Sequence, residues 1–330
     1  MSETAESGEF LEKFGYRGYD GTRKGKLARI MDLIIFEVKT TWNKSTFGKV
    51  LLIIILVLNG VVILIVSLIG GALPDFTHSQ IRNSIDFTVA TYLNFVGNPL
   101  RSSLEDSFFA ISIQIGFLLI ALFGIAGSGL FADDKEGRVI EIYLSRISKS
   151  EYIIGKIGAI LVYTNIFLMG PLLIITFLNL QSFGVNQIDF ISLYLGVIAF
   201  SLVASLILGL LILLLSSLVE KRNYASLSYF LIYVLGGIFG FSLYALDQNN
   251  QFLLLLSPEI FLSLLAFVCL GDFNIARIVN TSQGSELQPL LLNDGIGIEY
   301  WHVLLTALGY IVVFSILLYY KIAKLTTEEL

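Results

Sequence analysis

Long apolar runs dominate this chain and restrict what it can fold into. Six runs are long enough for an α-helix to cross a bilayer, whose hydrocarbon core of roughly 30 Å needs about 20 apolar residues. They cover 50–73, 108–131, 153–178, 190–218, 224–246 and 301–320. Their apolar residues do not alternate at every second position, as they would in a membrane β-barrel. The sequence therefore predicts an all-α integral membrane protein with six transmembrane helices.

The overall composition supports a membrane protein and excludes several classes of function. Hydrophobic residues make up 55% of the chain and charged residues 14%, whereas soluble domains have about 25% charged residues. One cysteine and two histidines exclude a disulfide framework and leave little material for a metal or nucleophilic site. We therefore expect no catalytic centre, no metal site, no cofactor site and no nucleic-acid partner in this chain.

The positions of the Lys and Arg residues predict the orientation. With the six spans above, 18 of the 21 Lys and Arg residues fall on one side, leaving Arg82, Arg101 and Arg277 on the other. Cytoplasmic segments collect Lys and Arg, so both termini are expected to be cytoplasmic and the protein to lie in a cell membrane. Lys156 and His302 are near span ends, where we expect their side chains to reach the lipid headgroups.

The segment before the first span is expected to contain a tail and an amphipathic helix. Residues 1–25 are charged and rich in glycine, which is typical of a flexible tail. In 26–49 the apolar residues recur at helical spacing, with Glu37 among the residues on the remaining surface. Such a helix suits the plane of the cytoplasmic interface, where it would contact membrane lipid; packing on a soluble partner is the alternative.

A further apolar segment, 252–270, is interrupted before it could span the bilayer. Ser257, Pro258 and Glu259 divide it into two short halves. We predict an external, re-entrant or interfacial hairpin, buried in protein or facing a wet cavity. A seventh span is the alternative, and it would move Lys321 and Lys324 to the outside.

The cytoplasmic segment between the second and third spans combines charge with an apolar run. Asp133, Asp134 and Glu136 extend the helix of the second span, and Gly137 weakens it. Ser148 and Glu151 form a capping box that starts the next helix near Lys149. The result is an elbow, residues 132–152, that is expected to present Tyr143, Leu144 and Arg146 to the cytosol. Because the apolar run at 139–144 needs a partner surface, we expect a docking site here.

The elbow resembles the cytoplasmic loop of type 2 ATP-binding-cassette (ABC-2) permeases. The resemblance rests on Asp134, Glu136, Gly137, Glu141, Leu144, Ser145, Arg146, Ile147, Ser148, Ser150, Glu151, Gly155 and Lys156. Val139 replaces a common threonine, and the usual proline after Arg146 is missing. Elsewhere the similarity is architectural and covers 50–330 as the transmembrane domain.

The resemblance implies that the elbow is a coupling helix in a groove of a separate ATPase subunit. The residues expected to contact that subunit are Asp134, Glu136, Gly137, Glu141, Tyr143, Leu144 and Arg146. The chain has no phosphate loop of the form G-x-x-x-x-G-K-[ST], so ATP and Mg would be bound by the partner. The chain itself is then expected to be a transport subunit and not an enzyme.

Small and polar residues within the spans suggest helix contacts and a pathway. Gly236 and Gly240 have the spacing of close helix packing, within the chain or, since this family works as dimers, against a second permease subunit. The spans contain few polar residues, and we expect these to bond to neighbouring helices or to line a pathway: Asn59, Gln114 and Asn165. So few polar residues would suit an amphiphilic or lipid-linked substrate. The alternatives are an ATP-independent carrier or channel, and a scaffold for a cytoplasmic complex.

Overall fold

The structure is a computed structural model. It describes residues 25–50, 52–54, 56–57, 60–61, 107–137, 139–140, 143, 147–182, 186–247, 250–270, 276–281, 284–289 and 298–328. Side chains of α5 are described from Ile120 onward. Residues 1–24 of the predicted tail and most of the predicted first span at 50–73 lie outside these residues.

Helices make up nearly all of the described structure. They are α2 (Lys26–Lys44), α5 (Ser107–Glu136), α7 (Lys149–Phe167), α8 (Met169–Ser182), η2 (Gln187–Phe190), α9 (Ile191–Leu218), α10 (Arg222–Leu246), η3 (Gln251–Leu256), α11 (Pro258–Leu270) and α12 (Tyr300–Glu328). Strands β1 (Ala276–Thr281) and β2 (Gly284–Pro289) pair antiparallel between α11 and α12. No strand was predicted in this segment from the sequence.

Four stretches among the described residues are long and apolar enough to cross a membrane. They are Lys149–Leu178, Gln187–Leu218, Arg222–Tyr244 and Tyr300–Lys324. They coincide with the last four predicted spans and confirm the prediction of a helical membrane protein. Helix α5 covers the second predicted span, 108–131.

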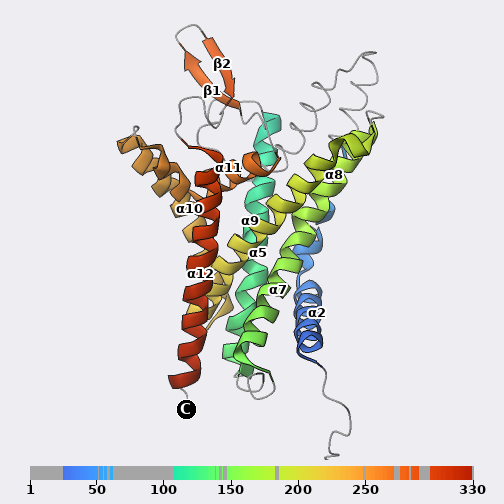
Figure 1. Cartoon of the computed structure of the whole chain (residues 1–330), viewed down its shortest axis with the longest axis vertical. Helices are drawn as coiled ribbons and strands as arrows, with labels where there is room; N and C mark the ends of the chain where they lie inside the picture. Colours follow the sequence, from blue (N-terminus) through green and yellow to red (C-terminus); the bar gives the residue numbers. More distant parts are fainter. Residues whose placement is uncertain are drawn as a thin grey trace, which may run out of the picture.

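Helix α9 lies at the centre of the bundle. It packs against α5, α7, α10, α11 and α12. Small residues on α9 permit this close packing, since a Cβ on Gly209 would lie 3.0 Å from Ile160 Cγ2 of α7. The last turn of α5, the start of α7, the α9–α10 turn and the end of α12 lie at one end of the bundle, and α11 and the β-hairpin lie at the other (Figure 1).

The third predicted span, 153–178, is divided between two helices. Helix α7 ends at Phe167, and α8 begins at Met169. Pro171 has no N–H group to donate to the Phe167 carbonyl, so the regular hydrogen-bond ladder cannot continue through this point.

The segment 252–270 breaks at Ser257. Helix η3 ends at Leu256 and α11 begins at Pro258. The break fits against α10, where a Cβ on Gly240 would lie 2.6 Å from the Ser257 nitrogen. Tyr310 Oη of α12 donates to the Leu255 carbonyl at 3.0 Å. The interruption predicted from the sequence is present, and its depth in the membrane stays a prediction.

Helix α2 runs alongside α7 in the same direction. Near the start of α7, a Cβ on Gly155 would lie 2.4 Å from Leu33 Cδ2. Near the end of α7, the ring centroids of Trp42 and Phe167 are 6.0 Å apart. Helix α2 thus packs lengthwise on α7, and its predicted position in the membrane interface stays a prediction.

Candidate functional site

The elbow connects the end of α5 to the start of α7. The Gly137 N–H donates to the Asp133 carbonyl at 3.0 Å, closing α5. Ser148 caps α7: its Oγ accepts from the Glu151 N–H at 3.3 Å, and Glu151 Oε2 accepts from the Ser148 N–H at 3.1 Å. This reciprocal pair is the predicted capping box and fixes where α7 begins.

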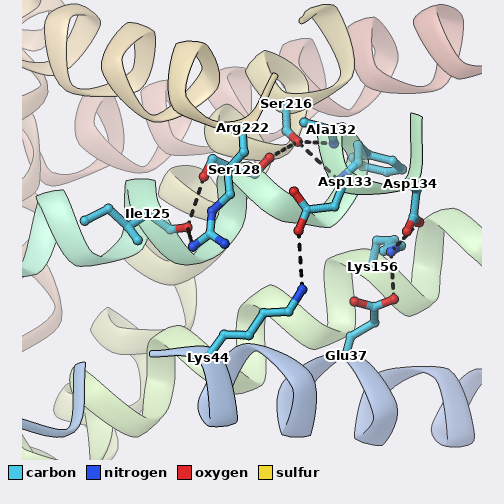
Figure 2. Close-up of polar contacts among 11 residues, drawn as sticks. Glu37, Lys44, Ile125, Ser128, Ala132, Asp133, Asp134, Lys156, Ser216 and Arg222 are labelled. Atoms are coloured by element: carbon cyan, nitrogen blue, oxygen red, sulfur yellow. Dashed lines mark hydrogen bonds and ion pairs between the residues drawn. The ribbon is translucent and has the colours of Figure 1, made fainter. Parts of the chain in front are cut away.

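A buried ion cluster of Glu37, Asp134 and Lys156 joins three helices beside the elbow. The Lys156 ammonium lies 2.7 Å from Glu37 Oε1 of α2 and 2.6 Å from Asp134 Oδ2 of α5 (Figure 2). Its side chain is 0% exposed. Tyr152 Oη also donates to Asp134 Oδ2, at 2.6 Å. The cluster therefore connects α2, the last turn of α5 and the first turns of α7.

Two expectations about these residues are wrong. Lys156 does not extend toward a headgroup region, and Glu37 is not on the outer surface of α2, because α2 packs over the start of α7 and buries both side chains between the helices. The predicted apolar face of α2 is instead partly exposed, with Leu27 80% exposed. A lysine inside an apolar run was the only sequence signal for a buried charge.

The ion cluster holds two carboxylates and one ammonium. Burial raises the pKa of Glu37 above its usual value, although the nearby Lys156 lowers it. The ammonium also lies 5.8 Å from the ring centroid of Tyr143 and 5.3 Å from that of Tyr152, within cation–π range. Burial, with the charges of Glu37 and Asp134, raises the pKa of Tyr143 to about 12.

Two weaker ion pairs flank the cluster. Arg29 Nη2 of α2 lies 3.1 Å from Glu151 Oε1, and Lys44 Nζ lies 3.6 Å from Asp133 Oδ2. The Lys44 side chain is 58% exposed, and exposed pairs contribute about 0–1 kcal/mol. Of the three basic residues in these contacts, Lys156 is the most buried.

The apolar run of the elbow packs on the chain itself. Ile140, Tyr143 and Ile147 are partly buried against the hydrophobic core, and the rings of Tyr143 and Tyr152 have centroids 5.7 Å apart. Ile140 and Tyr143 of the run, and Ile147 after it, thus have apolar contacts within the chain. Docking of a separate protein on this run stays a prediction.

The residues expected to contact an ATPase differ in their surroundings. Glu136 and Gly137 are exposed. Asp134 and Tyr143 bond or pack within the chain, as described above. Glu141, Leu144 and Arg146 lie outside the described residues.

The remaining predicted residues are also only partly described. A Cβ on Gly236 or Gly240 would meet Pro258 or Ser257 of the same chain, so this face of α10 packs within the chain, and its contact with a second subunit stays a prediction. Asn165 is buried, and its Nδ2 donates to the Leu161 carbonyl at 2.8 Å. Asn59 and the side chain of Gln114 lie outside the described part of the chain.

No known family model and no curated protein matches this chain. Its function is therefore inferred from the elbow motif and from the geometry around it.

Proposed function

We propose that the chain is the membrane-spanning subunit of an ATP-driven exporter of the ABC-2 type. ATP and Mg would be bound by separate cytoplasmic ATPase subunits, and the chain would pair with a second membrane subunit, identical or paralogous. In this proposal both termini are cytoplasmic, and the elbow transmits the closure of the ATPases to the spans.

One observation supports the proposal: beside the elbow, a buried lysine links α2, α5 and α7. A connection that only joins two helices in solvent does not require a lysine such as Lys156, which is 0% exposed and paired with two carboxylates. Burying charges is costly unless they are paired with good geometry. An elbow held in this way moves α2, α5 and α7 together when a partner displaces it, which is what coupling requires.

The surface that remains for the ATPase is the outer side of the elbow. Glu136 and Gly137 are exposed at the end of α5, while Asp134 and Tyr143 hold the elbow in shape from within. Asp134 and Tyr143 are thus positioning residues in this proposal. The apolar spans fit an amphiphilic or lipid-linked substrate.

The test is a charge reversal on the exposed side of the elbow. Glu136→Lys should abolish co-purification of ATP-hydrolysing activity from the native membrane without changing the helical content. Glu220→Lys is the matched control, because Glu220 is an exposed acid at the same end of the bundle, in the α9–α10 turn. Equal ATPase activity in the wild type and in Glu136→Lys would contradict the proposed docking site.

The ion cluster also favours a second candidate function, an ATP-independent, proton-coupled carrier. Buried ionisable groups in membrane proteins often mark proton relays, and the cluster has one more carboxylate than ammonium. This candidate predicts proton flux by the purified chain alone in liposomes, abolished by Glu37→Gln. Absence of flux without nucleotide, together with ATPase activity in the native complex, favours the exporter.

A further inference from the structure

Side chains from α9 and α10 bond to the backbone of α5 just before the elbow. Ser216 Oγ donates to the Ser128 carbonyl at 2.6 Å and accepts from the N–H groups of Phe131 and Ala132 at 3.2 and 3.0 Å (Figure 2). In a regular α-helix the Ala132 N–H would bond to the Ser128 carbonyl. The Ser216 hydroxyl therefore bonds to the Ser128 carbonyl and to the Ala132 N–H, the two groups that a regular helix would join to each other.

A second rung of α5 also has side-chain partners. The Ile125 carbonyl, which a regular helix would pair with the N–H four residues later, accepts from Ser128 Oγ at 3.0 Å and from Arg222 Nη2 at 3.2 Å. Beyond the first rung, the Lys135 ammonium donates to carbonyls at the end of α9, those of Ser217 and Val219. The end of α9, the start of α10 and the turn between them thus bond to the last turns of α5 at three levels.

The same stretch of α5 contains three glycines, each of which weakens a helix relative to alanine. Two of them are explained by close packing. A Cβ on Gly127 would lie 2.6 Å from Ile212 Cγ2, and one on Gly124 would lie 2.8 Å from Tyr229 Cδ1. Helix α5 therefore contains residues of low helix propensity where it is also bonded to the side chains of α9 and α10.

These contacts have a mechanical consequence. A side chain inserted beside the helix ladder is one of the established causes of bending, and buried N–H and C=O groups must keep partners when a helix bends. A serine hydroxyl can donate and accept at the same time. Ser216, which is fully buried, can therefore keep the Ser128 carbonyl and the Ala132 N–H paired when the distance between them increases.

We propose that α5 has a joint at residues 125–132, and that Ser216 is the positioning residue that lets the last turn of α5 bend with the elbow. The joint belongs to this chain alone. Its role in export rests on the proposed function, in which ATPase closure drives the bend.

The test measures the position of the elbow relative to the bundle. Spin labels are placed at two exposed positions, Glu136 of α5 and Leu308 of α12, after Cys269→Ser removes the natural cysteine. Pulsed electron paramagnetic resonance then gives the distance distribution in lipid nanodiscs, without nucleotide or partner. Ser216→Ala removes the hydroxyl, and Ser216→Thr keeps it.

The control is a neighbouring buried serine. Ser217 Oγ donates to the Leu214 carbonyl at 2.7 Å within α9 and does not bond to α5. Ser217→Ala thus removes a buried hydroxyl from the same turn without affecting the joint.

We expect two distance populations in the wild type, with the minor, bent one reduced about tenfold by Ser216→Ala. A tenfold change corresponds to about 1.4 kcal/mol, the size expected for a buried backbone group left unpaired. Ser216→Thr and Ser217→Ala should match the wild type. A single wild-type population, or equal distributions in the wild type and Ser216→Ala, would overturn the joint. The distances are measured without nucleotide or partner, so they do not depend on whether an ATPase binds the elbow, and the two proposals fail separately.

Discussion

Replacing Lys156 by methionine tests the ion cluster most directly. Methionine has a similar length and preserves most of the packing, but it leaves Glu37 and Asp134 without a counter-ion. The lost contacts are 2.7 and 2.6 Å long, and the lysine is 0% exposed. Removing one partner of a buried ion pair costs about 3–5 kcal/mol. Protonation of Glu37, whose pKa burial has already raised, limits the loss to that range.

The assay uses the tryptophan of α2 as the reporter. The chain has two tryptophans, so Trp301→Phe leaves Trp42, which packs near Phe167 of α7. Urea unfolding in detergent micelles, followed by Trp42 fluorescence, then reports the release of α2 together with loss of the fold. We expect Lys156→Met to lower the free energy of unfolding by about 3–5 kcal/mol.

Two further variants decide whether charge is the cause. Lys39→Met removes an exposed lysine of α2 and should change stability by less than about 0.5 kcal/mol. The triple variant Glu37→Gln, Asp134→Asn and Lys156→Met has no charge in the cluster. It should recover most of the free energy of unfolding that Lys156→Met loses, because replacing a whole buried ion cluster by uncharged side chains is often tolerated. If Lys156→Met is as stable as Lys39→Met, or if the triple variant recovers nothing, the reasoning is refuted.

Three more predictions concern the same protein. Folding raises the pKa of Glu37 above 4.5, so protonated Glu37 contributes stability that is complete below pH 4.5 and is lost as the pH rises through the folded-state pKa. In unfolding measured from pH 5 to 8, Glu37→Gln should therefore gain stability relative to the wild type. Gly240→Ala should lower the free energy of unfolding by about 1–3 kcal/mol through overpacking, because its Cβ would lie 2.6 Å from the Ser257 nitrogen. In the same unfolding assay Gly309→Ala should not destabilise the protein, because nothing lies within 4 Å of its Cβ. Lys44→Met should change stability by less than about 1 kcal/mol, because its partner Asp133 is 3.6 Å away and both are partly exposed; a larger loss in urea titration would show that this pair is not solvent-screened.

Local signals in the sequence predicted the helical elements well. The apolar runs gave the last four spans, and the Ser148–Glu151 spacing gave the start of α7 because both capping bonds form between neighbouring residues. The break at Ser257 was likewise marked by local sequence. Each of these features depends on residues a few positions apart.

The ion cluster could not be derived in this way. Glu37 and Lys156 are 119 residues apart in the chain, and the periodicity of α2 alone does not reveal which of its faces meets α7. The choice depends on Leu33 fitting over Gly155, a tertiary contact. The same limitation explains why Tyr143 was expected at the surface, although Tyr152 and Lys156 cover its ring.

The lengthwise pairing of α2 with α7 also constrains biogenesis. Arg29 and Glu37 meet their partners only after 122 and 119 further residues have been added, and synthesis proceeds from the N-terminus. Until Lys156 has been added, Glu37 of the nascent α2 has no lysine partner. Helix α2 can therefore reach its stable position only after insertion of the helix that begins at Lys149. A ribosome-bound chain ending before that helix should therefore leave α2 accessible to a water-soluble modifying reagent, and one extended past Phe167 should protect it.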